Sequence, residues 1–349
     1  MNLASIFKRY QDEFQNRYGA MFSSEQRDAF NAIIHCRTEY SGQLLLSCDQ
    51  CGHTEKRPHS CGNRSCPTCQ HHDAKNWVDN KMSKLLPVNY FMVTFTLPSE
   101  LRLLVLRNQR DCYQKLVSVA VQTLQSFSEN DDKLGGHLGL ITVLHTHSRR
   151  LDYHPHLHVV VPAGCFKKKE QQWVSHKGNY LFHGFALGKV FRARFLDALR
   201  QLGLKSPPTK VKKWVVDCKE VGNGAHALKY LSRYLYRGVV SEKNIIKDDG
   251  RSVTFRYTDS ETKSTKTRTL PGVEFIRLIL MHVLPSRFRR CREYGYLHGN
   301  CKIILKRIQL LLKTIVPNRV ILSKVGPLCP TCKEPMKIVA HIRRSWRSG

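Results

Sequence analysis

The sequence lacks any run of apolar residues near the roughly 18 that a membrane-spanning helix requires. Its beginning, MNLASIFKRYQDEF, is typical of an amphipathic helix and lacks both the apolar stretch and the small-residue cleavage site of a secretory signal. Acidic residues are scarce, with 27 Asp and Glu against 57 Lys and Arg, so the formal net charge is +30. We therefore expect a cytoplasmic protein that has no membrane partner and binds a polyanion, nucleic acid above all.

Length and composition favour a globular protein with more than one domain. The chain has 349 residues, of which 41% are apolar, so it can bury a substantial core. We expect two short helices and a zinc-binding module over residues 1–85, a core domain over 86–285, and a basic helical C-terminal region over 286–349. The C-terminal region is more basic than solubility requires, because residues 285–349 contain 15 Lys and Arg but only two Asp and Glu.

The chain is rich in cysteine, with thirteen cysteine residues. In a small secreted protein this number would indicate disulfides, but nothing in the sequence indicates secretion. Their spacing indicates metal instead. The motif CDQC brings Cys48 and Cys51 together and CPTC does the same for Cys66 and Cys69, with 14 residues between the pairs. This interval is one residue shorter than the usual zinc-ribbon spacing. Two such pairs can close one tetrahedral thiolate site for structural Zn²⁺, and Cys61 is an alternative ligand.

A third pair, Cys329 and Cys332 in CPTCKEPM, lies near the end of the chain. One pair cannot close a zinc site by itself, because four ligands are needed. A second zinc ion would need partners such as Cys291, Cys301 or a histidine. The other interpretation is that this pair binds nothing.

The predicted elements between residues 89 and 240 follow the order β-α-β-β-α-β, with one further helix. The patterns predict strands at 89–98, 139–147, 156–164 and 212–221, and helices at about 100–127, near 186–202 and at 224–240. This is the order of a ferredoxin-like arrangement with an appended helix. We therefore predict an α+β protein with an antiparallel sheet, in which the strand at 156–164 is central.

Residues 151–161, LDYHPHLHVVV, place His154, His156 and His158 at alternate positions before three valines. Alternate residues of an extended strand point to the same face, and β-branched valines favour such a strand. The three imidazoles therefore form a row, which can bind a metal ion or can consist of three unrelated histidines.

The last predicted helix, GAHALKYLSRYLYRGVV, separates its leucines from most of its polar residues. Tyr230 and Tyr234 lie one turn apart on a face that also carries His226, Arg233 and Arg237. Two tyrosines at this spacing are more often part of a core, but these point largely away from the leucines. A phenol flanked by guanidinium groups can meet a phosphate, so we expect Arg233 and Arg237 to contact DNA.

These features combine into one chemical hypothesis. A divalent ion bound by the histidine row would polarise a phosphodiester and neutralise its developing charge. A tyrosine hydroxyl on the last helix would attack the phosphorus atom and form a covalent phosphotyrosine bond. The second tyrosine, one turn away, could then accept the next strand.

The motif HPHLH, together with the YLSRY helix, resembles the two-tyrosine HUH transposases of rolling-circle insertion sequences. The stretch CDQCG…SCGNRSCPTCQ resembles the zinc-binding module of the same family, and RFRRCREYGYLHGNC with the late CxxC pair resembles its C-terminal part. The resemblance covers nearly the whole chain. It implies that residues 86–285 are an HUH catalytic core that cleaves and rejoins single-stranded DNA through a 5′-phosphotyrosine, leaving a free 3′-hydroxyl.

The resemblance also implies roles for individual residues. His156 and His158 would be the paired ligands of Mg²⁺ or Mn²⁺, and Tyr230 and Tyr234 would be the nucleophiles. The partner would be the single-stranded ends of an element in a bacterial cytoplasm, and no organic cofactor is implied. Because histidine is not the ligand that magnesium prefers, a further oxygen donor or water is expected.

The third protein ligand stays open at this point. We favour His145, which lies on the partner strand of the predicted hairpin. His226, Asp152 and His154 are the alternatives.

Three other functions fit part of the pattern. A zinc-dependent hydrolase with water as nucleophile would leave both tyrosines without a role. A non-catalytic zinc-finger DNA-binding protein accounts for the charge and the cysteines, but not for the histidine row. A replication initiator or conjugative relaxase would share the tyrosine chemistry. Neither the recognised DNA sequence nor the oligomeric state follows from the sequence.

Overall fold

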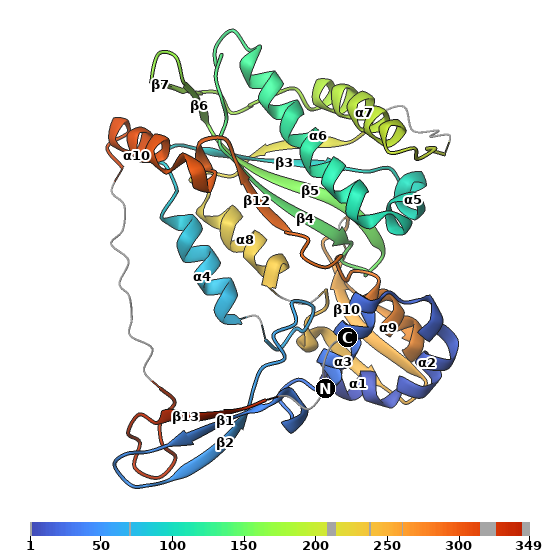
Figure 1. Ribbon diagram of the computed structural model, residues 1–349. Helices are drawn as coiled ribbons and strands as arrows, with labels where there is room; N and C mark the ends of the chain where they lie inside the picture. The colour runs from blue at the N-terminus through green and yellow to red at the C-terminus, as the bar shows by residue number, and fades with distance from the viewer. Residues whose placement is uncertain are drawn as a thin grey trace. The chain divides into compact units, whose positions relative to one another are not determined.

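A computed structural model describes residues 2–69, 71–207, 214–236, 239–259, 261–314 and 326–343, with the side chains of 71–74 and 233–236 left out (Figure 1). The chain folds into two compact units, each built from separate stretches of sequence. One unit combines Met1–His72, Tyr236–Val283 and Asn318–Gly349, and the other combines Asp73–Leu235 and Leu284–Pro317. Both contain helices and antiparallel sheets, so the prediction of an α+β protein is confirmed. The domain ranges 1–85, 86–285 and 286–349 stay a prediction.

The second unit contains a five-stranded antiparallel sheet in the order β12-β4-β5-β3-β8. Its strands are β3 (Tyr90–Thr96), β4 (Leu140–His147), β5 (Tyr153–Pro162), β8 (Val216–Glu220) and β12 (Cys291–Tyr294). The order β4-β5-β3-β8 is the ferredoxin-like one, and the histidine strand β5 is central as expected. β12 adds a fifth strand from the C-terminal region.

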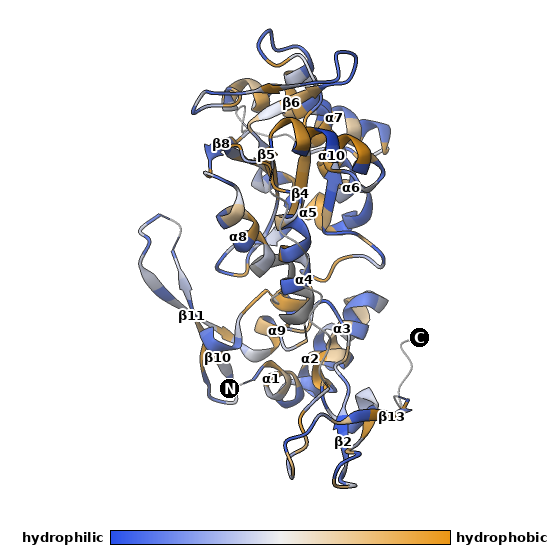
Figure 2. Cartoon of the chain, turned by 90° about the vertical axis from the view of Figure 1, so that its left-hand side faces the viewer, coloured by the Kyte–Doolittle hydropathy of each residue, from blue (hydrophilic) through white to orange (hydrophobic). Residues whose placement is uncertain are grey.

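The helices of this unit lie on both faces of the sheet. They are α4 (His71–Met82), α5 (Arg102–Arg107), α6 (Gln109–Glu129), α7 (Gly184–Gln201), α8 (Ala225–Tyr236) and α10 (Lys302–Leu311). Figure 2 shows the apolar ribbons of β4 and β5 between α8 on one side and α6 with α7 on the other. The rings of Phe95 and Phe191 lie 4.8 Å apart, so α7 packs on the face of β3 that carries Phe95. Because side chains alternate, Thr94 and the histidine row of β5 point to the opposite face.

A small hairpin, β6 (Gly164–Lys167) with β7 (Gln172–Ser175), follows β5 directly. It contains much of the lysine-rich excursion between β5 and α7. No helix among the described residues is long and apolar enough to cross a membrane.

Among its described residues, the first unit contains four α-helices and a three-stranded sheet in the order β11-β10-β9. The helices are α1 (Leu3–Arg9), α2 (Gln11–Tyr18), α3 (Ser24–Ile34) and α9 (Gly272–Leu280), and the strands are β9 (Ile245–Asp248), β10 (Ser252–Thr258) and β11 (Thr265–Pro271). The rings of Phe7 and Phe14 lie 5.2 and 5.3 Å from that of the buried Phe30. Two short helices were expected at the start of the chain, but residues 2–40 form three α-helices: α1, α2 and α3. The reason is that α1 ends just before Tyr10 and α2 begins just after it.

The same unit contains a second three-stranded sheet, in the order β13-β1-β2. Its strands are β1 (Gln43–Ser47), β2 (Thr54–Pro58) and β13 (Lys337–Ile342), and both pairings are antiparallel. The C-terminal region therefore contributes α10 and also two strands, β12 and β13, which join different sheets.

Candidate active site and cysteine clusters

Three histidines form a compact cluster at the centre of the ferredoxin-like sheet. His156 of β5 pairs in register with His145 of β4, and His158 lies two residues further along the same face of β5. The ring centroids are 4.5 to 5.1 Å apart. One nitrogen from each ring lies within 4.8 Å of the other two, so the three side chains can bind one metal ion.

Hydrogen bonds fix the orientation of two of these rings. Nδ1 of His156 lies 2.7 Å from the carbonyl oxygen of His154 and must donate, because a carbonyl only accepts. Nδ1 of His158 lies 2.9 Å from the hydroxyl of Thr94 on β3. Both contacts engage Nδ1, which leaves Nε2 of each ring as the nitrogen for a metal ion. Such partners orient metal-binding histidines and raise their basicity.

Burial keeps the cluster in the neutral form that binds metal. Burial lowers the pKa of His158 to about 3, with a smaller contribution from His156, and it lowers the pKa of His156 as well. The pKa of the fully buried His145 falls well below its usual value for the same reason, with further contributions from the other histidines. Neutral imidazoles at physiological pH are ready ligands, because no proton has to leave before a metal binds.

The other proposed third ligands lie outside this group of three. Nδ1 of His154 accepts a hydrogen bond from the guanidinium group of Arg102 at 2.9 Å. The carboxylate of Asp152 accepts a hydrogen bond from the Ser148 hydroxyl within the β4–β5 turn. His226 is exposed on α8. The geometry thus brings together His145, His156 and His158.

Tyr230 lies beside the histidine cluster. Its ring on α8 is 6.4 Å from the ring of His158 and perpendicular to it. Tyr234 follows on the same helix, one turn or about 6 Å further along the axis. The side chains of Tyr234 and Arg233 lie outside the described ones, and Arg237 lies outside the described residues altogether.

The cysteines form two separate groups of four. One group contains Cys36, Cys61, Cys66 and Cys69, and the other contains Cys48, Cys51, Cys329 and Cys332. In each group all four sulfur atoms lie within 4.8 Å of one another. The grouping expected from spacing, with Cys48, Cys51, Cys66 and Cys69 around one ion, is therefore corrected by the structure.

Strand geometry explains the correction. The β1–β2 hairpin holds Cys48 and Cys51 at its closed end, whereas Cys36 precedes the hairpin and Cys61 follows it at the open end. Strands of five residues separate the two ends by about 16 Å, which is too far for one tetrahedral site. Cys36 was missed because it has no CxxC partner and because the two CxxC pairs already supplied four ligands.

Both groups have the dimensions of a tetrahedral zinc site. A Zn–S bond of about 2.3 Å places the sulfur atoms of a tetrahedron about 3.8 Å apart. In the first group Sγ of Cys69 lies 3.1 Å from that of Cys36 and 3.6 Å from that of Cys61. None of the thirteen cysteines forms a disulfide.

Two models of known protein families match this chain, and the histidine cluster, Tyr230 and most of the grouped cysteines lie within the matched residues. Residues 139–303, which include the histidine cluster and Tyr230, match a family model described as "Putative transposase". Residues 6–97 match a second model, "Transposase zinc-binding domain". This range contains all cysteines of both groups except Cys329 and Cys332.

Two relatives match most of the chain. The "Putative transposase y4qJ" of Sinorhizobium fredii is 33% identical over 321 residues, covering 85% of this chain and 80% of that protein. The "Transposase for insertion sequence element IS801" of Pseudomonas savastanoi pv. phaseolicola is 26% identical over 310 residues, covering 82% and 73%. Among solved structures, TrwC complexed with a 27-mer DNA matches with 20% identity and a TM-score of 0.30, over 36% of this chain and 49% of that chain.

Proposed function

The chain belongs to the IS91 family of transposases, and from this premise we propose that it cuts and rejoins single-stranded DNA in rolling-circle transposition. The nucleophiles are the hydroxyls of Tyr230 and Tyr234, and the product of cleavage is a 5′-phosphotyrosine. The observation that carries this proposal is the position of the Tyr230 ring, 6.4 Å from the ring of His158 in a cluster able to bind metal.

The first step exchanges one phosphodiester bond for another. The Tyr230 oxygen bonds to phosphorus and the bond from phosphorus to the 3′-oxygen of the preceding nucleotide breaks. The phenolic proton is lost, and the leaving 3′-oxygen takes up a proton and becomes a free hydroxyl. A 3′-hydroxyl that attacks the phosphotyrosine reverses the exchange and rejoins DNA. Tyr234, one turn away, can cut a second strand while the first stays attached.

The histidine cluster is proposed to hold the divalent ion. A Mg²⁺ or Mn²⁺ ion held by His145, His156 and His158 would neutralise charge on the scissile phosphate. Imidazole suits Mn²⁺ better than Mg²⁺, so oxygen ligands are needed besides the three nitrogens. Thr94 and the carbonyl of His154 keep the rings in place before DNA arrives.

The remaining residues of the proposal bind DNA or stabilise the fold. The net charge of +30 favours association with phosphates, and Arg233 and Arg237 are proposed to contact the strand beside the tyrosines. Cys36, Cys61, Cys66 and Cys69 are proposed to hold a structural Zn²⁺ within the zinc-binding domain. The bacterial cytoplasm as the place of action stays a prediction.

The test is a denaturing gel of the protein incubated with Mn²⁺ and single-stranded oligonucleotides from its element's ends. Wild type should give a covalent band that survives SDS, and the Tyr230→Phe/Tyr234→Phe double variant should give none. Tyr236→Phe, the third tyrosine of α8, is the matched control and should behave as wild type. Metal-dependent nicking without an adduct would contradict the proposal and favour a hydrolase; binding without cutting would indicate a DNA-binding protein.

A further inference from the structure

We propose that Cys48, Cys51, Cys329 and Cys332 bind a second structural Zn²⁺, so that a zinc site of this chain is closed by its C-terminal segment. The matched zinc-binding domain ends at residue 97 and contains only the first two of these cysteines. The other two follow the whole of the ferredoxin-like unit in the sequence. Three observations support the site: two matching turns, the sulfur positions and a very small apolar core.

The two CxxC turns have the same backbone geometry. The amide of Cys48 donates to the carbonyl of His53 at 2.9 Å, and the amide of Gly52 donates to the carbonyl of Cys48 at 2.9 Å. In the C-terminal turn, the amide of Cys329 donates to the carbonyl of Glu334 at 2.8 Å, and that of Lys333 donates to the carbonyl of Cys329 at 3.0 Å. The spacing of donors and acceptors is identical in both turns.

The resemblance between the turns extends to an unusual dihedral angle. Gly52 has φ of 69°, and Lys333 at the equivalent position has φ of 65°. A left-handed conformation is natural for glycine but costs a lysine free energy, so it persists only where the surroundings impose it. Lys333 thus has the same backbone conformation as Gly52, which strengthens the match between the two turns.

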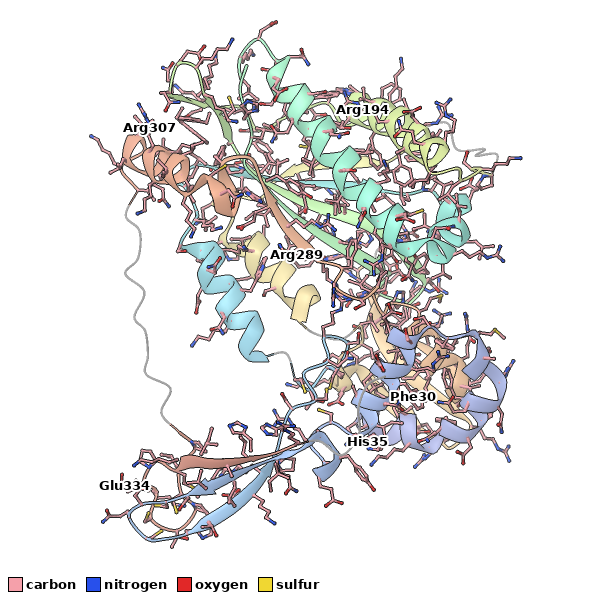
Figure 3. All side chains as sticks on the ribbon, viewed as in Figure 1. Phe30, His35, Arg194, Arg289, Arg307 and Glu334 are labelled. Atoms are coloured by element: carbon pink, nitrogen blue, oxygen red, sulfur yellow. The ribbon has the colours of Figure 1, made fainter. Side chains whose placement is uncertain are left out.

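The sulfur atoms of the two turns face one another. Sγ of Cys48 lies 3.4 Å from Sγ of Cys332, and Sγ of Cys51 lies 3.6 Å from Sγ of Cys329. A tetrahedral Zn²⁺ site requires about 3.8 Å between sulfurs, so small shifts suffice. Figure 3 shows Glu334 at the end of the β13-β1-β2 sheet where these sulfur atoms gather.

Apolar packing alone cannot hold β13 in place. The fully buried core around the site consists of Leu46, Cys48, Cys329 and Met336, with Leu44 and Cys332 packed against it. On β13 itself, Ile338 and Val339 remain 51% and 56% exposed. Structures with so small a core normally depend on a metal or disulfides. Zinc would therefore be the main tie between the C-terminal segment and the β1–β2 hairpin.

The first test is the zinc content of the full-length purified protein, measured by elemental analysis beside protein concentration. We expect two ions per chain in wild type and one in Cys329→Ser/Cys332→Ser. The matched control is Cys291→Ser/Cys301→Ser, because neither cysteine belongs to a four-cysteine group, and it should retain two ions. A zinc content in Cys329→Ser/Cys332→Ser equal to that of wild type would overturn the proposal.

A second measurement uses only the wild-type protein, so it holds even where a variant fails to fold. Cys51 is exposed, and a free thiol there should react at once with a maleimide. If zinc is bound, Cys51 and Cys332 should stay unlabelled until a strong chelator is added, and peptide mass spectrometry would identify them. Rapid labelling of both cysteines in the zinc-loaded protein would contradict the second site.

Discussion

Replacing Thr94 by valine should weaken metal binding at the histidine cluster by about 10- to 100-fold, or about 1.4 to 2.7 kcal/mol. Valine keeps the shape of threonine but removes the hydroxyl that lies 2.9 Å from Nδ1 of His158. Because His158 is only 8% exposed, water has little access to replace this partner. The ring then loses both its fixed orientation and the hydrogen bond that raises the basicity of Nε2.

The assay is calorimetric titration of the protein with Mn²⁺ in the absence of DNA. Thr94→Ser keeps a hydroxyl and should bind Mn²⁺ nearly as tightly as wild type. Thr96→Val is the matched control on the same strand, since Thr96 is opposite His156, whose Nδ1 is already bonded to the backbone. Wild-type affinity in Thr94→Val, or an equal loss in Thr94→Ser, would refute the positioning role of Thr94.

Three further predictions follow from the same contacts. His156→Ala should abolish DNA cleavage, while fluorescence anisotropy should show largely unchanged DNA binding. Normal cleavage by this variant would show that His156 is not a required metal ligand. Because the pKa of His158 falls to about 3 in the folded protein, below its usual 6.5, the unfolded chain binds more protons between these values. In the metal-free protein, the contribution of His158 to stability should thus be fully present above pH 6.5 and be lost as the pH drops toward 3. Thermal denaturation at several pH values would show this, and the melting temperature of His158→Gln should depend less on pH. Phe30→Ala should destabilise the first unit by about 3–5 kcal/mol, because the buried ring contacts Phe7 and Phe14; a loss below about 1 kcal/mol in urea denaturation would contradict this packing.

Local periodicity was enough to predict the ferredoxin-like sheet. The alternation of His154, His156 and His158 defines a strand from adjacent residues alone, and its valines predict that it is buried. Short connections of fixed handedness allow only a few sheet topologies for the order of strands and helices between residues 89 and 240. The ferredoxin-like order is the one observed. His145 could be proposed as a neighbour because a short loop joins its strand to β5.

Contacts between distant parts of the sequence could not be predicted in the same way. The sulfur atoms of Cys48 and Cys332 are in contact across 284 positions, and nothing near either residue identifies the other. β12 and β13 likewise pair with strands far away in sequence, where local patterns give no register. Spacing predicted that the cysteines bind metal, but which four share an ion depends on the length of the β1–β2 hairpin.

Peptide mapping of the covalent adduct tests the central claim most directly. The protein would be incubated with Mn²⁺ and a short single-stranded substrate, digested with nuclease and trypsin, and sequenced by tandem mass spectrometry. We predict a nucleotide attached through a 5′-phosphate to Tyr230 or Tyr234, and none when both are phenylalanine. Attachment to any other residue, or cleavage with no attached nucleotide, would contradict the account.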